Sequence, residues 1–266
     1  MPFFKTPRGL DWHYEVSGEG EDVLFIHGFG VSSRLWTAQV EHFRNFCRVI
    51  TVDLPGHGQT SWRPVRLPDM ARDINLILQS FGDHPVNVVG SSFGGLVGLY
   101  LLKIDPWRVA RMCFAGSLFK FAKTATYPAG LDIERIRKMS DQFGGDYASI
   151  LDIFFRSLFS RQERESERFK WIKQFQKSSA VPQRDALIHF LSILEKEDAR
   201  DIIASIGCRV QFITGTEDYI VTPAAMEWME EMMPLANYDY LDGVGHFPFL
   251  TKPKQFNDLL EGFLAS

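Results

Sequence analysis

The chain has 266 residues, of which 45% are hydrophobic and 23% charged, and its formal net charge is −4. This length suits one α/β domain with an insertion and a large core. The weak negative charge excludes a whole-chain field that attracts nucleic acid or an anionic membrane. The sequence has no apolar signal core near its start and no run of the roughly 18 apolar residues of a membrane span, so we expect a cytoplasmic protein.

Short apolar runs alternate with helical patterns along most of the chain. The first two runs, Trp12–Val16 and Val23–His27, are expected to form a hairpin across Ser17–Gly20. Further strands are predicted at Val49–Asp53, Val86–Ser91, Met112–Ser117, Val210–Gly215 and Tyr238–Asp242. Helical patterns lie at Leu67–Phe81, Phe93–Ile104, Pro223–Met233 and Pro253–Leu264. This alternation indicates an α/β fold with a doubly wound, mostly parallel sheet.

The alternation stops between about Leu118 and Glu197, where the pattern is helical and contains no convincing strand. We therefore expect a helical cap inserted between two sheet strands, over the C-terminal edge of the sheet. The predicted domains are an α/β core, residues 1–117 and 198–266, and a cap, residues 118–197.

The three cysteines, Cys47, Cys113 and Cys208, are odd in number and widely spaced, as expected of free thiols in a reducing compartment. The sequence contains no CxxC pair or Cys/His cluster, so no metal is expected. Its glycine runs lack the G-x-G-x-x-G pattern, so no nucleotide or flavin cofactor is expected.

A candidate nucleophile lies in the sequence Gly90-Ser91-Ser92-Phe93-Gly94. The pattern G-x-S-x-G is weak by itself, but here it follows a predicted strand and opens a predicted helix. That context is the one a nucleophile elbow requires. Ser92 is the predicted nucleophile, and the neighbouring Ser91 is one place off the motif.

A serine hydroxyl needs a base to accept its proton. His246 lies in the loop Gly243–Pro248, directly after the last predicted strand, and is the predicted base. The other histidines are assigned to structural places: loop bracing for His27, a turn for His57, packing for His189, and surface or turn positions for His13, His42 and His84.

The histidine in turn needs a carboxylate that fixes its tautomer. Asp218 follows the predicted strand Val210–Gly215 and is preferred over its rivals Glu217 and Asp242. The order nucleophile, acid, histidine matches the order expected for this fold. The backbone N–H groups of Phe29, in a glycine-containing loop, and Phe93 are the expected oxyanion donors.

Taken together, these segments resemble the α/β-hydrolase superfamily over nearly the whole chain. The matching segments are His27–Gly30, Asp53–Gly58, Gly90–Gly95, Gly215–Asp218 and Gly243–Pro248. Within the superfamily the chain is similar to the pimeloyl-acyl-carrier-protein methyl ester esterases of biotin synthesis, including Gly245–Leu250 and Lys252-Pro253. The resemblance implies a cytoplasmic carboxylesterase that releases a carboxylate and methanol from a carrier-bound dicarboxylate methyl ester. That family often has Trp where Phe29 and Ser91 stand here.

The predicted cap supplies the remaining candidate residues. Arg161, Arg164 and Arg168 recur at helical spacing on one face and, with Arg156, could dock an acidic acyl carrier protein. The alternative is a solvated face with ion pairs between neighbouring turns. The candidate walls of the acyl pocket are Phe29, Phe119, Phe121, Phe154, Phe155 and Phe190.

Two other functions remain open at this point. A serine triad also supports carbon–carbon bond hydrolysis, lactone opening and perhydrolysis, and pocket shape decides among them. A chain that keeps the triad can also act as a small-molecule receptor with slow turnover. Haloalkane dehalogenation and epoxide opening are disfavoured because they use an aspartate where Ser92 stands.

Overall fold

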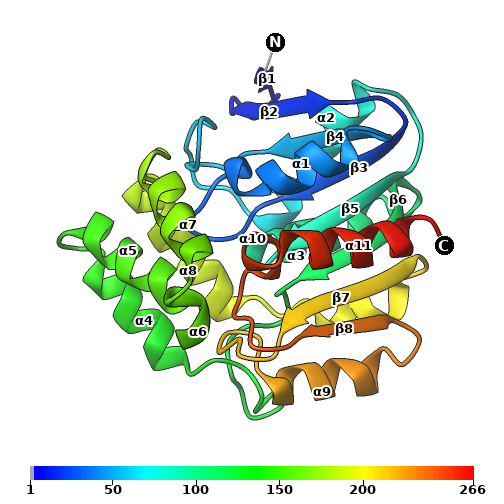
Figure 1. Cartoon of the computed structure of the whole chain (residues 1–266). Coiled ribbons are helices and arrows are strands. Elements are labelled where there is room, and N and C mark those ends of the chain that lie inside the picture. Colours follow the sequence, from blue (N-terminus) through cyan, green and yellow to red (C-terminus); the bar gives the residue numbers. More distant parts are fainter. Residues whose placement is uncertain (1–2) are drawn as a thin grey trace.

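The computed structural model describes residues 3–266, whose eight strands form one sheet. The order along the sheet is β1-β2-β4-β3-β5-β6-β7-β8 (Figure 1). The bounds are β1 Phe3–Lys5, β2 Asp11–Ser17, β3 Glu21–Ile26, β4 Cys47–Val52, β5 Val86–Ser91, β6 Val109–Ala115, β7 Arg209–Gly215 and β8 Asn237–Leu241. Strand β2 is antiparallel to β1 and β4, and the other neighbours are parallel. The predicted doubly wound, mostly parallel sheet is confirmed.

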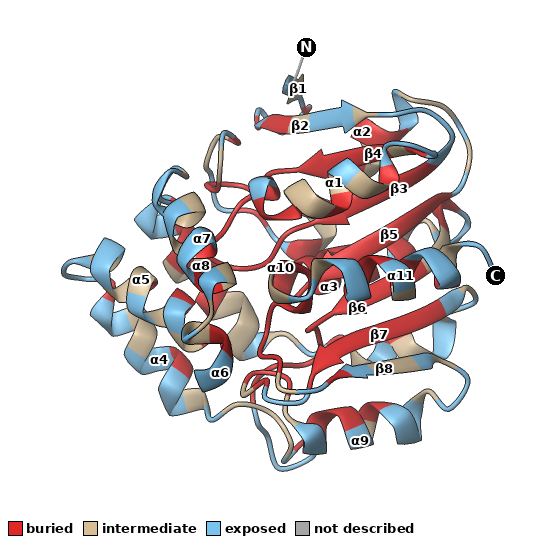
Figure 2. Ribbon diagram, viewed as in Figure 1, coloured by how far each residue is buried: buried red, intermediate tan, exposed pale blue. Residues whose placement is uncertain are grey.

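Helices cover both faces of this sheet. Those that belong to the sheet region are α1 Thr37–Phe43, α2 Leu67–Gln79, α3 Phe93–Ile104, α9 Pro223–Met232, α10 Pro248–Thr251 and α11 Pro253–Leu264, with short 3-10 helices at Ser33–Trp36, Pro106–Arg108 and Arg200–Ser205. Figure 1 shows α1 and α11 in front of the sheet and α2 and α3 behind it. The central strands are therefore buried on both faces, as Figure 2 shows.

The core is apolar and rich in phenylalanine. Phe25 on β3, Phe114 on β6 and Phe212 on β7 are completely buried. The rings of Phe114 and Phe212 stack with centroids 5.0 Å apart. Burial of an aromatic side chain contributes roughly 2–3 kcal/mol each, so these residues stabilise the sheet rather than line a site.

The predicted hairpin between β2 and β3 is wrong. Strand β2 pairs with β4, where Tyr14 lies opposite Val52, and β3 lies between β4 and β5. The reason is burial: residues 23–26 are completely buried and need a strand on each side, whereas β2 is half exposed and suits a place near the sheet edge. The turn at Gly18 crosses β4, where a Cβ would lie 2.3 Å from the carbonyl oxygen of Cys47.

Five helices between β6 and β7 form a separate group, which we call the helical segment (residues 118–197). They are α4 Ile133–Gln142, α5 Tyr147–Ser157, α6 Arg161–Arg164, α7 Glu167–Lys177 and α8 Arg184–Lys196. Figure 1 shows them beyond the ends toward which the parallel strands point. No helix in the described part of the chain is long and apolar enough to cross a membrane.

The three cysteine thiols are free. Cys47 and Cys113 are buried, and Cys208 is partly buried. Burial raises the pKa of the Cys208 thiol to about 11, and it also raises the pKa of Cys113. All three are therefore poor nucleophiles near neutral pH.

Candidate active site

Ser92 occupies a strained turn between β5 and α3. Its backbone has φ 50° and ψ −118°, and it is the only non-glycine residue with positive φ among residues 3–266. Such a conformation costs of order 1–3 kcal/mol and persists only where the surroundings fix it. The Ser92 N–H donates to Ala115 O at 3.1 Å, and Ser117 Oγ donates to Ser92 O at 2.6 Å. Both bonds hold the turn against β6 and the loop that follows it.

Glycines make this turn sterically possible. A Cβ at Gly90 would lie 2.5 Å from the Cα of Gly95. A Cβ at Gly94 would lie 2.3 Å from the carbonyl oxygen of Ile26. The motif residues around Ser92 are therefore required by the close approach of β5, α3 and β3.

The imidazole of His246 forms a short hydrogen bond with a buried carboxylate. His246 Nδ1 lies 2.7 Å from Asp218 Oδ2, and each residue is 3% exposed. Asp218 Oδ1 accepts the N–H groups of Ile220 at 2.8 Å and Val221 at 3.1 Å. Because an ionised carboxylate only accepts hydrogen bonds, this arrangement places the proton on Nδ1 and leaves Nε2 as an acceptor.

Ser92 and His246 line the same cavity, which has a volume of about 430 Å³. Within residues 3–266 neither the Ser92 hydroxyl nor His246 Nε2 is hydrogen-bonded to another group. Such bonds are often long in a free enzyme and shorten when substrate binds. The two free groups therefore share the space in which a ligand would lie.

The rival carboxylates point to no histidine. Glu217 is exposed, and so is Asp242, which accepts a hydrogen bond from Thr216 Oγ1 at 3.3 Å. One histidine is not where the sequence pattern put it: His13 is buried rather than at the surface. Its Nδ1 lies 2.9 Å from Asp53 Oδ2, so this pair belongs to a structural network.

Two buried histidines hold the loop His27–Gly30. His27 Nε2 accepts the N–H of Leu54 at 2.9 Å, and His57 Nε2 accepts the N–H of Gly30 at 3.2 Å. Burial lowers the pKa of His57 to about 3 and also lowers the pKa of His27. Both rings are therefore neutral near pH 7, which is the state that offers an acceptor nitrogen.

Asp53 anchors the other side of this loop system. Its carboxylate accepts the N–H groups of Ser33 and Gln59, each at 2.9 Å, besides the bond from His13. Burial alone would raise the pKa of Asp53, but the hydrogen bond from His13 and the backbone donors lower it well below its usual range. Asp53 is therefore ionised, and both of its carboxylate oxygens already accept hydrogen bonds.

The two expected oxyanion donors lie on either side of Ser92. Phe93 is the first residue of α3, so its N–H has no partner within the helix. The N–H of Phe29 donates to no group among residues 3–266. A Cβ at Gly28, one residue before Phe29, would lie 3.1 Å from Ser92 Cβ, which shows how closely this loop approaches the serine.

The cavity has apolar walls and a charged rim. It is lined by Phe29, Phe121, Leu131, Arg135, Ile136, Lys138, Met139, Gln142, Ile150, Ile153, Phe154, Ser157, Leu191, Leu194, Tyr219 and Ile220, besides the Ser92 and His246 named above. Arg135 and Lys138 on α4 are exposed and have no ion-pair partner among the described residues. The sequence pattern missed both, and it gave no signal for Lys138, because Glu134 and Asp141 stand at pairing distance from it along a helix.

Three of the six candidate wall residues line the cavity, namely Phe29, Phe121 and Phe154. The other three pack elsewhere: Phe119 against Phe114 at 5.0 Å, Phe155 against Phe159 at 5.2 Å, and Phe190 against Phe93 at 4.3 Å. These are centroid distances of buried ring pairs. The assignment of Phe119, Phe155 and Phe190 to the wall is corrected accordingly, because core packing takes their rings.

The expected basic helix face does not form. Ser166 caps a new helix, so Arg161 and Arg164 lie on α6 while Arg168 lies on α7. Arg164 donates to Phe159 O, and Arg168 donates to Leu250 O at 2.8 Å. Only Arg161, paired with Glu165 at 3.2 Å, and Arg156 remain exposed.

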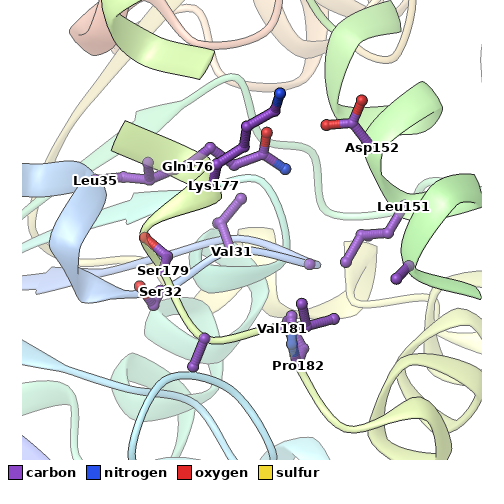
Figure 3. A pocket seen from close by; sticks show the side chains of 13 residues that line it. Val31, Ser32, Leu35, Leu151, Asp152, Gln176, Lys177, Ser179, Val181 and Pro182 are labelled. Carbon is purple, nitrogen blue, oxygen red and sulfur yellow. The ribbon is translucent and has the colours of Figure 1, made fainter. Parts of the chain in front are cut away.

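A second, smaller cavity of about 210 Å³ lies beyond the loop that follows Gly30. Figure 3 shows Leu151 and Asp152 of α5 on one side and Gln176 and Lys177 of α7 on the other. It contains neither Ser92 nor His246. The cavity of about 430 Å³, which contains both residues, is therefore the candidate active site.

Comparison with known proteins identifies the family of the chain. Residues 23–259 match the alpha/beta hydrolase family. A pimeloyl-[acyl-carrier protein] methyl ester esterase of Nitrosomonas europaea is 28% identical over 92% of this chain and 96% of the relative. The same enzyme of Aromatoleum aromaticum is 30% identical over 90% of this chain and 96% of the relative. An esterase structure from Exiguobacterium antarcticum superposes with a TM-score of 0.89, at 23% identity and 99% coverage of both chains. The chain thus belongs to the alpha/beta hydrolase family and is a carboxylic ester hydrolase.

Proposed function

We propose that Ser92, His246 and Asp218 form the catalytic triad of this esterase. The observation that carries the proposal is the buried 2.7 Å pair of His246 and Asp218, which shares one cavity with a serine on a strained turn. His246 Nε2 would take the proton of Ser92 as its Oγ attacks the ester carbonyl. Asp218 would stabilise the resulting imidazolium. The alcohol leaves, and water then hydrolyses the acyl-enzyme by the same steps.

The oxyanion of each tetrahedral intermediate would be held by the N–H groups of Phe29 and Phe93. Losing one such donor typically costs about 3 kcal/mol of transition-state stabilisation. The bond from Gly30 to His57 and the position of Phe93 at the start of α3 fix the two donors before substrate binds. Preorganised donors need no rearrangement when charge develops.

We further propose that the substrate is the methyl ester of a pimeloyl chain on an acyl carrier protein. Relatives named for this reaction align with this chain over more than nine-tenths of their own length. The cavity is within the usual size range of small-molecule sites, and its walls suit an aliphatic chain. Residues 118–197 would serve as the cap that shields this chain from water.

The carrier protein would dock at the cavity rim. Arg135 and Lys138 stand at the mouth without carboxylate partners, Ile153 beside them is 65% exposed, and Arg156 lies on the same helix as Ile153. Unpaired cations around an apolar patch attract an acidic partner, most strongly at low salt. Arg164 and Arg168 are excluded from this surface because backbone carbonyls occupy them.

The decisive experiment is complementation of a biotin-requiring strain that lacks its methyl ester esterase. The wild-type chain should restore growth, and Ser92→Ala should not. In parallel, purified enzyme should convert a pimeloyl-carrier methyl ester to the free acid and methanol. Failure of the wild type in both assays, with normal hydrolysis of a p-nitrophenyl ester, would reject the carrier-bound substrate and keep the esterase.

Docking is tested by charge reversal at the rim. Arg135→Glu with Lys138→Glu should lower the ratio of kcat/KM for the carrier-bound ester to kcat/KM for a small free ester. Lys254→Glu on α11 is the control, because Lys254 is exposed, pairs with Asp258 and does not line the cavity. An unchanged ratio in the double variant would contradict docking at this rim.

A further inference from the structure

Glu163 is a buried carboxylate in the helical segment that the proposed chemistry does not use. It lies on α6 and is 6% exposed. Its Oε2 accepts the N–H of Ser160 at 2.6 Å and the N–H of Gly245 at 2.9 Å. Its Oε1 is buried and has no partner among residues 3–266. One oxygen thus joins the start of α6 to the loop that carries His246.

The contact between this loop and α6 is close along its whole length. A Cβ at Gly245 would lie 2.4 Å from Leu158 O and 3.0 Å from Glu163 Oε2. The N–H of His246 donates to Leu158 O at 2.8 Å, and Ser160 Oγ donates to Gly243 O at 2.8 Å. Backbone groups of three loop residues are therefore held by residues 158–163.

Asp218 fixes the ring of His246 but not the backbone that carries it. Gly245 directly precedes His246 in this loop. Gly243, two residues before Gly245, has φ +71°. Glycine gives such a loop freedom to move, so its position depends on contacts from outside. Glu163 is the charged residue among those contacts, and hydrogen bonds to an ionised acceptor are about twice as strong as neutral ones.

We propose that Glu163 is a positioning residue for His246, a role that rests on the proposed function. By holding Gly245, it sets the distance between the imidazole and Ser92. The helical segment then has a part in the chemistry as well as in binding: the base is in place only while α6 is docked on its loop.

The test is a set of variants assayed on a small free ester. Glu163→Ala should lower kcat about 100-fold with little change in KM, since a misplacement of about 1 Å can cost that much. Glu163→Gln keeps an oxygen that can accept both N–H groups and should recover most of kcat. The rate at which a fluorophosphonate labels Ser92 should follow kcat, because labelling also requires proton removal. Glu165→Gln is the matched control, as Glu165 is exposed and pairs only with Arg161.

The outcomes distinguish a failure of the positioning role of Glu163 from a failure of the proposed triad. Wild-type kcat and labelling in a folded Glu163→Ala variant, with an inactive His246→Ala, would overturn the positioning role alone. An active His246→Ala would overturn the proposed triad itself. If Glu163→Ala is unfolded at the assay temperature, Glu163→Asp serves instead, because it keeps the charge but is one methylene too short to reach both donors. Full kcat in that variant overturns the role, and a fall with unchanged KM supports it.

Discussion

The sheet region and the helical segment are built in different ways. The residues of the proposed triad follow strand ends of the sheet region, where the backbone is buried and glycines allow contacts too close for a Cβ. The helical segment consists of short helices, four of which begin at a side-chain cap: Asp132, Asp146, Ser160 and Ser166. Its residues contribute most of the cavity wall. The positions of the proposed triad residues are thus held by the closely packed sheet region. The helical segment supplies most of the side chains that would contact a substrate.

The sharpest test of this division is removal of the nucleophile. Ser92→Ala should lower kcat for a p-nitrophenyl ester by about 10⁶-fold, the size seen when a triad loses its nucleophile. The melting temperature should change little, because alanine fits the same turn. Substantial remaining turnover would mean that the reaction does not use the sheet region's serine.

The next largest effect is expected from the carboxylate. Asp218→Asn keeps an oxygen for the N–H groups of Ile220 and Val221 but favours the wrong histidine tautomer, so kcat should fall about 10⁴-fold. Asp242→Asn is the control, since Asp242 is exposed and bonds only to Thr216. Equal losses in the two variants, measured by steady-state kinetics, would remove Asp218 from the triad.

Acid should destabilise the sheet region through its buried histidines. The pKa of His57 is lowered from 6.5 to about 3 in the folded chain, so the unfolded chain binds the extra proton as pH falls. The stabilisation is complete above pH 6.5 and is lost between pH 6.5 and 3, by roughly 5 kcal/mol at most. Urea unfolding of His57→Gln should show a slope with pH that is smaller by up to about 1.4 kcal/mol per pH unit. Identical slopes in both proteins would show that His57 stays solvated.

Smaller effects, of opposite sign, are expected on the free energy of unfolding when each of two glycines is replaced by alanine. Gly94→Ala in the sheet region should cost about 1–3 kcal/mol of stability, because its Cβ meets the backbone of Ile26 and His27. At Gly145 in the helical segment a Cβ would make only an ordinary contact, 3.9 Å from the carbonyl oxygen of Gln142, so Gly145→Ala should stabilise the chain by about 0.4–1 kcal/mol. Chemical denaturation measures both. Similar costs at the two sites would show that the regions do not differ in packing.

The sheet region was also the part that the sequence could predict. The bounds of β5, α3 and α11 agree with the predicted ones, and β7 and β8 begin one residue earlier. These elements are apolar runs bounded by glycine or proline, so local pattern and burial coincide. The places of Ser92, Asp218 and His246 follow from the same pattern, since Ser92 directly follows β5 and the other two lie in the loops after β7 and β8.

What could not be predicted depends on contacts between distant residues. The pairing of β2 with β4 is decided by which strand is fully buried, and periodicity does not show this. A phenylalanine in an apolar helix face or loop packs equally well on the core or along a cavity, so Phe119, Phe155 and Phe190 were misplaced. The break at Ser166 separates Arg164 from Arg168 because a cap interrupts an otherwise helical spacing.

Phe190 of α8 has a consequence for the resting enzyme. Its ring lies 4.9 Å from the ring of His57, which holds Gly30, and 4.3 Å from the ring of Phe93, the residue after Ser92. A single side chain of the helical segment is thus shared by the two stretches of backbone next to the serine. Both stretches lose the same neighbour if this ring is removed, so the helical segment braces the serine turn as well as lining the cavity beside it.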